Sequence, residues 1–327
     1  MKRLARVAAR LGVTAVLSVS TVFVANAADE ATLRLNWLLG GLHAPFYLGV
    51  ERGYYADEDI DLTINEGKGS GVAMQVIAAK GDTFGMSDAG TLMLGVSKGQ
   101  NVKAIMSLLN TSGFGIISLA DANIKTAKDL EGKTLAVSPG DALTQLFPAI
   151  VAANDLDQDK IKLVFMDPGA KPVAVMEKTV DALLGGIDDQ IFLIQAQGFD
   201  AEALRFADLG ANTVGITVHT NGDTIEENPD LVARFVRASQ KAWDAAVEDP
   251  EAAVAAAMKV KPDLNADSLL KQLKVDLDLL QSANTQGKPI GYAAEADWEL
   301  TKELLTKYRD LDTDRPADSF YTNEFVE

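Results

Sequence analysis

Cysteine is absent from this 327-residue chain, and histidine occurs only twice, as His43 and His219. The missing thiols exclude disulfides, zinc fingers, iron–sulfur clusters and cysteine nucleophiles. Two histidines leave little for a histidine-built metal centre. We therefore expect neither a resident metal ion nor a cofactor.

Basic charge is also scarce, because 30 lysines and arginines face 47 acidic residues, giving a net charge of −17. A chain this acidic has no general footprint for a phosphate backbone, which excludes a nucleic-acid binder of the usual electrostatic kind. The hydrophobic share of 47% is ordinary for a globular protein. The length fits one large domain or two of average size.

Long hydrophobic runs are missing except near the start, where four basic residues precede an uncharged, mostly apolar run at 11–24. This run would span only about 21 Å as a helix, which is too short to anchor the chain in a membrane. Ala25-Asn26-Ala27 is typical of a cleavage site. We interpret residues 1–27 as a signal peptide and expect a soluble periplasmic protein. Its mature form would carry no lipid, insert in no membrane and have a net charge of about −21.

The pattern of apolar residues predicts two cycles of alternating strands and helices, at 32–109 and 115–218, followed by a helical remainder. This rhythm is typical of α/β sheets with crossover helices. Small residues at 110–115 and 210–214 suit hinge segments. Two lobes joined by two crossings would then comprise 28–112 with 214–327 (lobe I) and 113–213 (lobe II).

Several short motifs occur in a characteristic order. The segment that starts at Leu35 reads LNWLLGGLHAPFYLGVERGYY, with Asn-Trp, His-x-Pro and Glu-x-Gly-Tyr in sequence. Later motifs are Asp129-Leu130-Glu131-Gly132-Lys133, Asn228-Pro229, Asp249-Pro250 and Tyr321-Thr322-Asn323-Glu324. Together they cover nearly the whole mature chain, which resembles the thiamine-pyrimidine branch of the type II periplasmic binding proteins. Sulfonate, nitrate and aromatic-acid binding proteins share much of this pattern.

The resemblance implies an α/β fold of two lobes, with two mixed sheets flanked by helices and a hinge of two crossings. It also implies a monomeric receptor that closes on one small molecule and delivers it to an ABC permease. A thiamine pyrimidine precursor is the first expectation for the ligand. An aromatic carboxylate or an alkyl sulfonate is the alternative.

Ligands of open α/β sheets bind beyond the carboxyl ends of the strands, and this rule selects five loops here. Trp37 ends the first predicted strand, where it could stack on a planar ligand or simply pack. His43 could hydrogen-bond the ligand or cap the following helix. Tyr47, one turn further on, could offer its ring edge or its hydroxyl.

Two further loops lie between a predicted strand and a helix. In the first, the Ser87 hydroxyl could bind a ligand, and Asp88 could do so or cap the helix. In the second, with Ser138, Asp141 and Thr144, backbone N–H groups suit an anion. The Asp141 carboxylate instead favours an amino-bearing ligand, or only caps the helix.

The last loop contains Asp188, which could accept a hydrogen bond from an exocyclic amino group or be a solvated surface charge. None of the five loops contains an arginine, which disfavours a strongly charged dianion as ligand. The predicted ligand-binding residues are Trp37, His43, Tyr47, Ser87, Asp88, Ser138, Asp141, Thr144 and Asp188.

The alternative of another class is an enzyme, because the resembling family includes pyrimidine synthases. Their implied lysine and histidine fall on Ser87 and Thr91, and their cysteine cluster falls near 210–218, where this chain has no cysteine. A Schiff base with pyridoxal phosphate needs an amine, which neither side chain offers. We therefore expect a receptor and not an enzyme.

Overall fold

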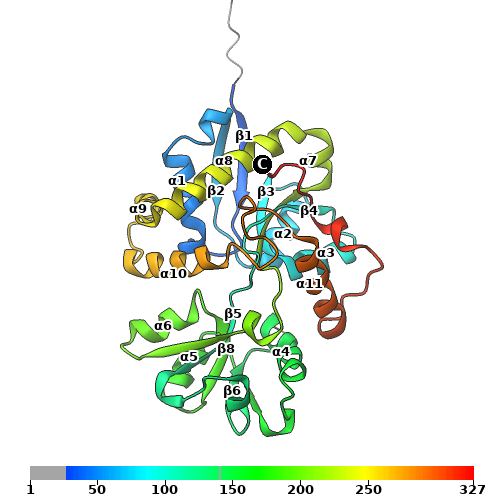
Figure 1. The fold of residues 1–327 in the computed structure, drawn as a ribbon. Helices are drawn as coiled ribbons and strands as arrows, with labels where there is room; N and C mark the ends of the chain where they lie inside the picture. The colour runs from blue at the N-terminus through cyan, green and yellow to red at the C-terminus, as the bar shows by residue number, and fades with distance from the viewer. Residues whose placement is uncertain (1–26, 140) are drawn as a thin grey trace, which may run out of the picture.

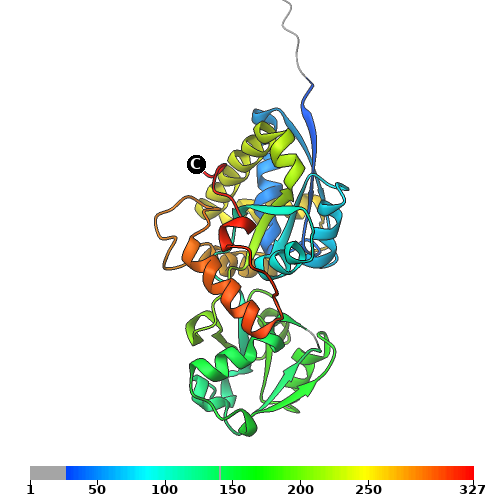
Figure 2. The same ribbon diagram turned by 90° about the vertical axis from the view of Figure 1, so that its right-hand side faces the viewer.

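A computed structural model describes residues 27–139 and 141–327. The predicted signal peptide lies outside these residues, except for Ala27. The chain forms two five-stranded sheets, ordered β2-β1-β3-β10-β4 and β7-β6-β8-β5-β9. Figures 1 and 2 show the two sheets, each with its helices, as two bodies stacked one above the other. We call the body with the first sheet lobe I and the other lobe II.

Lobe I is built on a mixed sheet. Strand β1 runs parallel to β2 and β3, whereas β10 runs antiparallel to β3 and β4. The strands are β1 (Asp29–Arg34), β2 (Ile60–Asn65), β3 (Phe84–Asp88), β4 (Val102–Ser107) and β10 (Ile216–Asn221). The helices are α1 (Ala44–Glu51), α2 (Ser70–Ala78), α3 (Ala89–Ser97), α7 (Gly222–Glu227), α8 (Pro229–Glu248), α9 (Pro250–Val260), α10 (Ala266–Leu279) and α11 (Glu295–Tyr308).

Lobe II repeats this plan. Strand β6 runs parallel to β7 and β8, and β5 runs antiparallel to β8 and β9. The predicted α/β fold with two mixed sheets is thereby confirmed. The strands are β5 (Phe114–Leu119), β6 (Thr134–Val137), β7 (Lys162–Phe165), β8 (Ala182–Gly186) and β9 (Ala201–Arg205). The helices are α4 (Ala142–Ala153), α5 (Ala170–Met176) and α6 (Gln190–Ala196).

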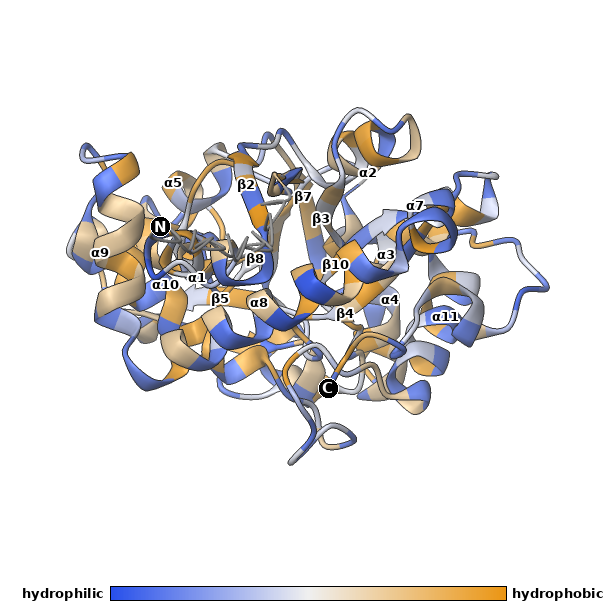
Figure 3. Cartoon of the chain, turned by 90° about the horizontal axis from the view of Figure 1, so that it is seen from above, coloured by the Kyte–Doolittle hydropathy of each residue, from blue (hydrophilic) through white to orange (hydrophobic). Residues whose placement is uncertain are grey.

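One of the two hydrophobic cores of lobe I lies between its sheet and helix α8. Phe235 of α8 stacks on Phe84 of β3 with ring centroids 3.7 Å apart, and Trp243 meets the edge of Phe46. Helix α8 buries these aromatic residues because they recur on one side of the helix, as its alternating colours in Figure 3 illustrate. Helix α8 thereby covers one face of the lobe I sheet.

Helix α11 adds a contact between the lobes besides the two chain crossings. Its Leu304 belongs to the hydrophobic core of lobe II, and its Tyr308 packs against the same core. Figure 2 shows the helix descending from lobe I onto lobe II. The residue that follows the helix is therefore placed between the lobes.

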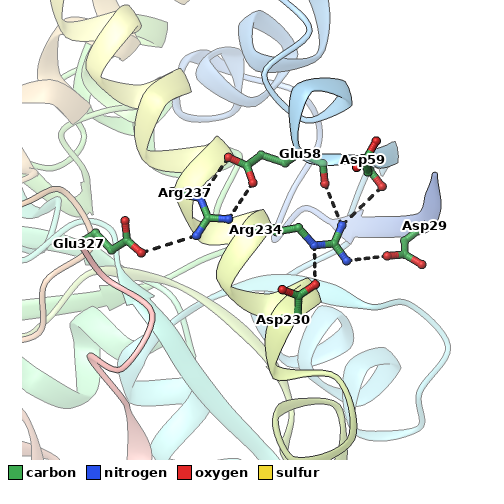
Figure 4. Close-up of polar contacts among 7 residues, drawn as sticks. All are labelled: Asp29, Glu58, Asp59, Asp230, Arg234, Arg237 and Glu327. Atoms are coloured by element: carbon green, nitrogen blue, oxygen red, sulfur yellow. Dashed lines mark hydrogen bonds and ion pairs between the residues drawn. The ribbon is translucent and has the colours of Figure 1, made fainter. Parts of the chain in front are cut away.

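On the outer face of lobe I, two arginines of α8 hold the first strand and the last residue together (Figure 4). Arg234 donates hydrogen bonds to Asp29 at 2.5 Å and to the Glu58 carbonyl oxygen at 2.8 Å. Arg237 binds the Glu58 carboxylate at 2.7 Å and lies 3.5 Å from the Glu327 carboxylate. Exposed pairs of this kind add little free energy each, but here they join four segments of the chain.

The part of the chain that the structure describes has no helix long and apolar enough to cross a membrane. Within the same residues, no three acidic or histidine side chains gather as they would to hold a metal ion.

Candidate functional site

Two neighbouring cavities lie between the lobes, with volumes of about 690 Å³ and about 120 Å³. The larger cavity is walled by the loop at 36–43, by helix α10 and by the loop that follows β8 in lobe II. Gly186 and Asp188 line both cavities. A volume of this size is typical of a small-molecule site, so the larger cavity is the candidate ligand site.

Trp37 lies on the wall of the larger cavity, in a loop three residues beyond the end of β1. Its side chain is 57% exposed, although its backbone is held by the loop after β2. The Gly67 N–H donates to the Trp37 carbonyl oxygen at 2.9 Å, and the Gly69 N–H donates to the Asn36 carbonyl oxygen at 2.7 Å. A Cβ at Gly67 would lie 1.8 Å from the Leu35 oxygen, so this approach requires glycine. The result is a fixed backbone that carries an exposed indole.

His43 lines the same cavity, but its ring nitrogens are already used. Nδ1 accepts a hydrogen bond from the Gly40 N–H at 3.0 Å, and Nε2 donates to the Asn36 side-chain oxygen at 2.9 Å. Burial lowers the pKa of His43 to about 4, so the ring is neutral at physiological pH. His43 therefore holds the loop at 36–43 and makes no side-chain cap of α1, while its ring stays in the cavity wall.

Tyr47 and Ser87, two of the predicted ligand-binding residues, line neither cavity. Tyr47 points into the core of lobe I, where burial raises its pKa to about 12. Ser87 is fully buried in β3, with its hydroxyl 3.2 Å from Nδ1 of His219. Both predictions relied on position after a strand or within a helix, which does not reveal toward which side a residue points.

Asp88 and Asp141 cap helices, as one of the two predicted alternatives had it. Asp88 accepts from the Thr91 N–H at 2.7 Å, and Asp141 accepts from the Thr144 N–H at 2.6 Å. Asp88 also lines the smaller cavity. Asp141, Thr144 and Ser138 line neither cavity, and the Thr144 hydroxyl donates to the Ser138 carbonyl oxygen at 3.0 Å.

Asp188 stands at the junction of the two cavities, close to two glycines. A Cβ at Gly186 would lie 2.6 Å from the Asp188 carboxylate, and a Cβ at Gly113 would lie 3.3 Å from it. Burial, helped by the charge of Asp189, raises the pKa of Asp188 to about 6. Above this pH the carboxylate is an acceptor at the centre of the cleft.

Sequence reasoning missed Arg309, which lines the smaller cavity. Its Nε donates to the Gln145 side chain of lobe II at 2.9 Å. Burial lowers the pKa of Arg309, and the negative charges of Asp88 and Asp141 oppose that effect. An arginine thus reaches the cleft although none lies in the five loops. It could not be foreseen, because only the packing of α11 on lobe II brings it there.

Sequence reasoning also missed Asp276 of α10, which lines the larger cavity and is 1% exposed. Burial and the nearby charge of Asp188 raise its pKa well above the usual range. The sequence does contain a signal for it. Leu269, Leu273 and Leu280 are spaced with Asp276 along one side of the helix, so an acid occupies a core position.

The larger cavity is acidic. Three aspartates line it, Asp188, Asp189 and Asp276, and among the described residues it has no lysine or arginine in its wall. In the smaller cavity, Arg309 is matched by the acidic groups that face it. This balance favours a ligand that offers N–H donors over an anionic ligand.

Residues 41–253 match the protein family described as NMT1/THI5 like. The chain is 24% identical to the riboflavin-binding protein RibY of Chloroflexus aurantiacus, over 91% of this chain and 86% of that protein. It is 23% identical to the formylaminopyrimidine-binding protein of Halalkalibacterium halodurans, over 84% of each. A 4-amino-5-hydroxymethyl-2-methylpyrimidine phosphate synthase of Legionella pneumophila is 22% identical, over 91% of this chain and 92% of the synthase.

Among solved structures, the periplasmic aliphatic sulphonate binding protein SsuA of Escherichia coli superposes with a TM-score of 0.69 at 15% identity. The match covers 89% of this chain and 97% of SsuA. SsuA of Xanthomonas axonopodis, bound to MOPS, gives a TM-score of 0.65 at 14% identity, over 90% and 99%. The chain belongs to the NMT1/THI5-like family and has the fold of the periplasmic binding proteins.

Proposed function

We propose that this protein is a periplasmic solute-binding receptor that closes on one planar, nitrogen-containing ring and passes it to an ABC importer. The observation that carries the proposal is that Trp37 of lobe I and Asp188 of lobe II line one cavity. The indole offers a stacking surface, and the carboxylate offers a hydrogen-bond acceptor. A ligand that contacts both groups stabilises the closed arrangement of the lobes.

A thiamine pyrimidine precursor remains the first candidate for the ligand. Two relatives are named as binding proteins for formylaminopyrimidine and for riboflavin. Both of these ligands are flat nitrogen heterocycles. The three aspartates of the larger cavity favour such a ring over an aromatic carboxylate or an alkyl sulfonate. Riboflavin is the second candidate, because RibY matches along nearly the whole chain.

We propose a receptor without catalytic activity, although some relatives are named as synthases. Ser87 and Thr91, which take the places of the synthase lysine and histidine, carry no amine. Ser87 is buried against His219, and the Thr91 backbone binds the capping carboxylate of Asp88. A covalent amine intermediate has no nucleophile at these positions.

The remaining sequence predictions form part of the same proposal. The mature chain begins after residue 27 and acts in the periplasm as a monomer. It delivers its ligand to an ABC permease. The chain passes from lobe I to lobe II between residues 112 and 113 and returns between residues 213 and 214. These crossing points agree with the strands, since the second sheet uses residues 114–205 only.

The test is a thermal-shift and titration screen of the chain from Ala28 onward. The probes are formylaminopyrimidine, riboflavin, an aromatic carboxylate and an alkyl sulfonate. A ligand present at 100 times its Kd should stabilise the protein by about 2.7 kcal/mol. Small-angle scattering should then report a smaller radius of gyration. Stabilisation by the anionic probes alone, or turnover of any probe, would reject the proposal.

A further inference from the structure

Asp276 carries a buried carboxylate for which the described residues offer no partner. It is 1% exposed, and its Oδ1 accepts no hydrogen bond from any described residue. Among the same residues it also forms no ion pair within 4.0 Å. Burying a polar group without a partner is unfavourable, and a charged group more so. Such a group is retained at a cost in stability.

The fold makes no use of this carboxylate. Leu269, Leu273 and Leu279 of α10 are buried with it in the core of lobe I, and a fourth leucine in its place would suit that surface. Asp276 nevertheless lines the larger cavity, next to the loop that carries Trp37. An acid on an apolar helix face that borders a ligand-sized cavity points to a ligand.

Asp188 is the acidic residue that acts on Asp276 from the other lobe. The two acids belong to different lobes, line one cavity and interact, because the charge of Asp188 raises the pKa of Asp276. Asp276 therefore retains its proton to a higher pH than an isolated carboxyl. The other titratable groups in the cavity wall are Asp189, beside Asp188, and the neutral His43, with Glu66 behind it.

We infer that Asp276 is a second ligand-binding residue, and that with Asp188 it holds a two-donor edge, an amino group beside a protonated ring nitrogen. The inference rests on the proposed function, since it specifies the ligand of the same cavity. A neutral aminopyrimidine takes up the Asp276 proton on binding: the carboxyl O–H bond breaks and a ring N–H bond forms. The resulting cation and the two carboxylates form charge-assisted hydrogen bonds across both lobes.

The probes are 4-amino-2-methylpyrimidine and its 4-oxo counterpart, which has the same outline but no amino group. Asp276→Asn should reduce affinity for the amino compound at least tenfold and should change affinity for the oxo compound little. Asp278→Asn is the matched control, because Asp278 is exposed on the same helix. If the asparagine variant folds poorly, Asp276→Leu, which suits the apolar face, tests the same loss of affinity for the amino compound.

Ultraviolet absorption supplies a readout that a structural role would not move, because ring protonation changes the spectrum of an aminopyrimidine. The bound amino compound should show the protonated spectrum in the wild type and the neutral spectrum in Asp276→Asn. Equal affinity in the wild type and both Asp276 variants, or a neutral spectrum in the wild type, would overturn the inference alone. A wild type that binds no planar heterocycle would instead reject the proposed function.

Discussion

At the scale of single residues, two side chains of the cleft differ in how they are positioned, Trp37 through its backbone and Asp188 through the residues around it. Trp37 is exposed, but glycine N–H groups of a neighbouring loop fix its position. Asp188 is enclosed by glycines that leave room for its carboxylate. The first group supplies contact area and the second supplies charge, so each can be removed separately.

Trp37→Ala should weaken the binding of a planar ligand by about 1–3 kcal/mol, because the stacked ring is lost. Trp37→Phe should recover part of the affinity. Isothermal titration measures both changes, with Leu300→Ala as the control at an exposed position on α11. Unchanged titration heats in Trp37→Ala would remove the indole from the site.

The raised pKa of Asp188 predicts how stability depends on pH. Between pH 3.8 and about 6 the folded protein binds more protons at this group than the unfolded chain does. Stability therefore falls as the pH rises through this window, by up to roughly 3 kcal/mol from this residue. Urea unfolding from pH 4 to pH 7 should show a smaller fall for Asp188→Asn, and parallel curves would contradict the shift.

At the scale of elements, the contact between the loop at 36–43 and helix α10 shapes the larger cavity. The Gly41 N–H donates to the Gln272 side chain at 3.0 Å. A Cβ at Gly41 would lie 2.5 Å from the Leu273 nitrogen and 2.7 Å from the Leu269 oxygen. The loop carries Trp37 and the helix carries Asp276, so this contact sets where the two lie.

Gly41→Ala should destabilise the protein by roughly 1–3 kcal/mol and weaken ligand binding, because helix backbone must move. Gly71→Ala in α2 is the control, since nothing lies within 4 Å of its Cβ. The control should be neutral or more stable by about 0.5–1 kcal/mol. Chemical denaturation compares the two, and equal stabilities would disprove the close contact.

The sequence pattern predicts helices at 44–51 and 295–308 and strands at 60–65 and 182–186, which are the observed bounds of α1, α11, β2 and β8. It does not predict short helices without periodicity. Helix α6 buries only Ile194, and α7 buries no residue, so neither carries an apolar stripe. The pattern places the first strand at 32–37, three residues later than β1, because the apolar residues that follow β1 belong to the Trp37 loop. The predicted strand at 213–218 is β10, shifted to Ile216–Asn221.

At the scale of the whole molecule, the cleft is completed by helices from the last third of the chain. The rule that sites lie beyond the ends of strands led to Trp37 and Asp188. It could not lead to Asp276 or Arg309, which reach the cleft from α10 and from the end of α11. The helical spacing marks Asp276 as an acid at a core position, but only the packing between distant segments places either residue in the cleft.

Arg309→Gln should make closure less favourable. Without the guanidinium, Asp88 of lobe I and Asp141 of lobe II lose the positive charge that faces both. Ligand affinity should drop by about 1–3 kcal/mol. Arg315→Gln, at an exposed position, is the control. Titration and small-angle scattering of the two variants provide the test, and identical closure in both would assign Arg309 no part in it.

The two arginines of α8 bring the beginning of β1 and the final residue within one turn of the same helix, on the outer face of lobe I. A short linker could therefore join these two points. The chain could then be opened at a surface turn of lobe II while both crossings between the lobes stay intact. A circularly permuted chain would thus carry a reporter domain on lobe II and leave both crossings intact.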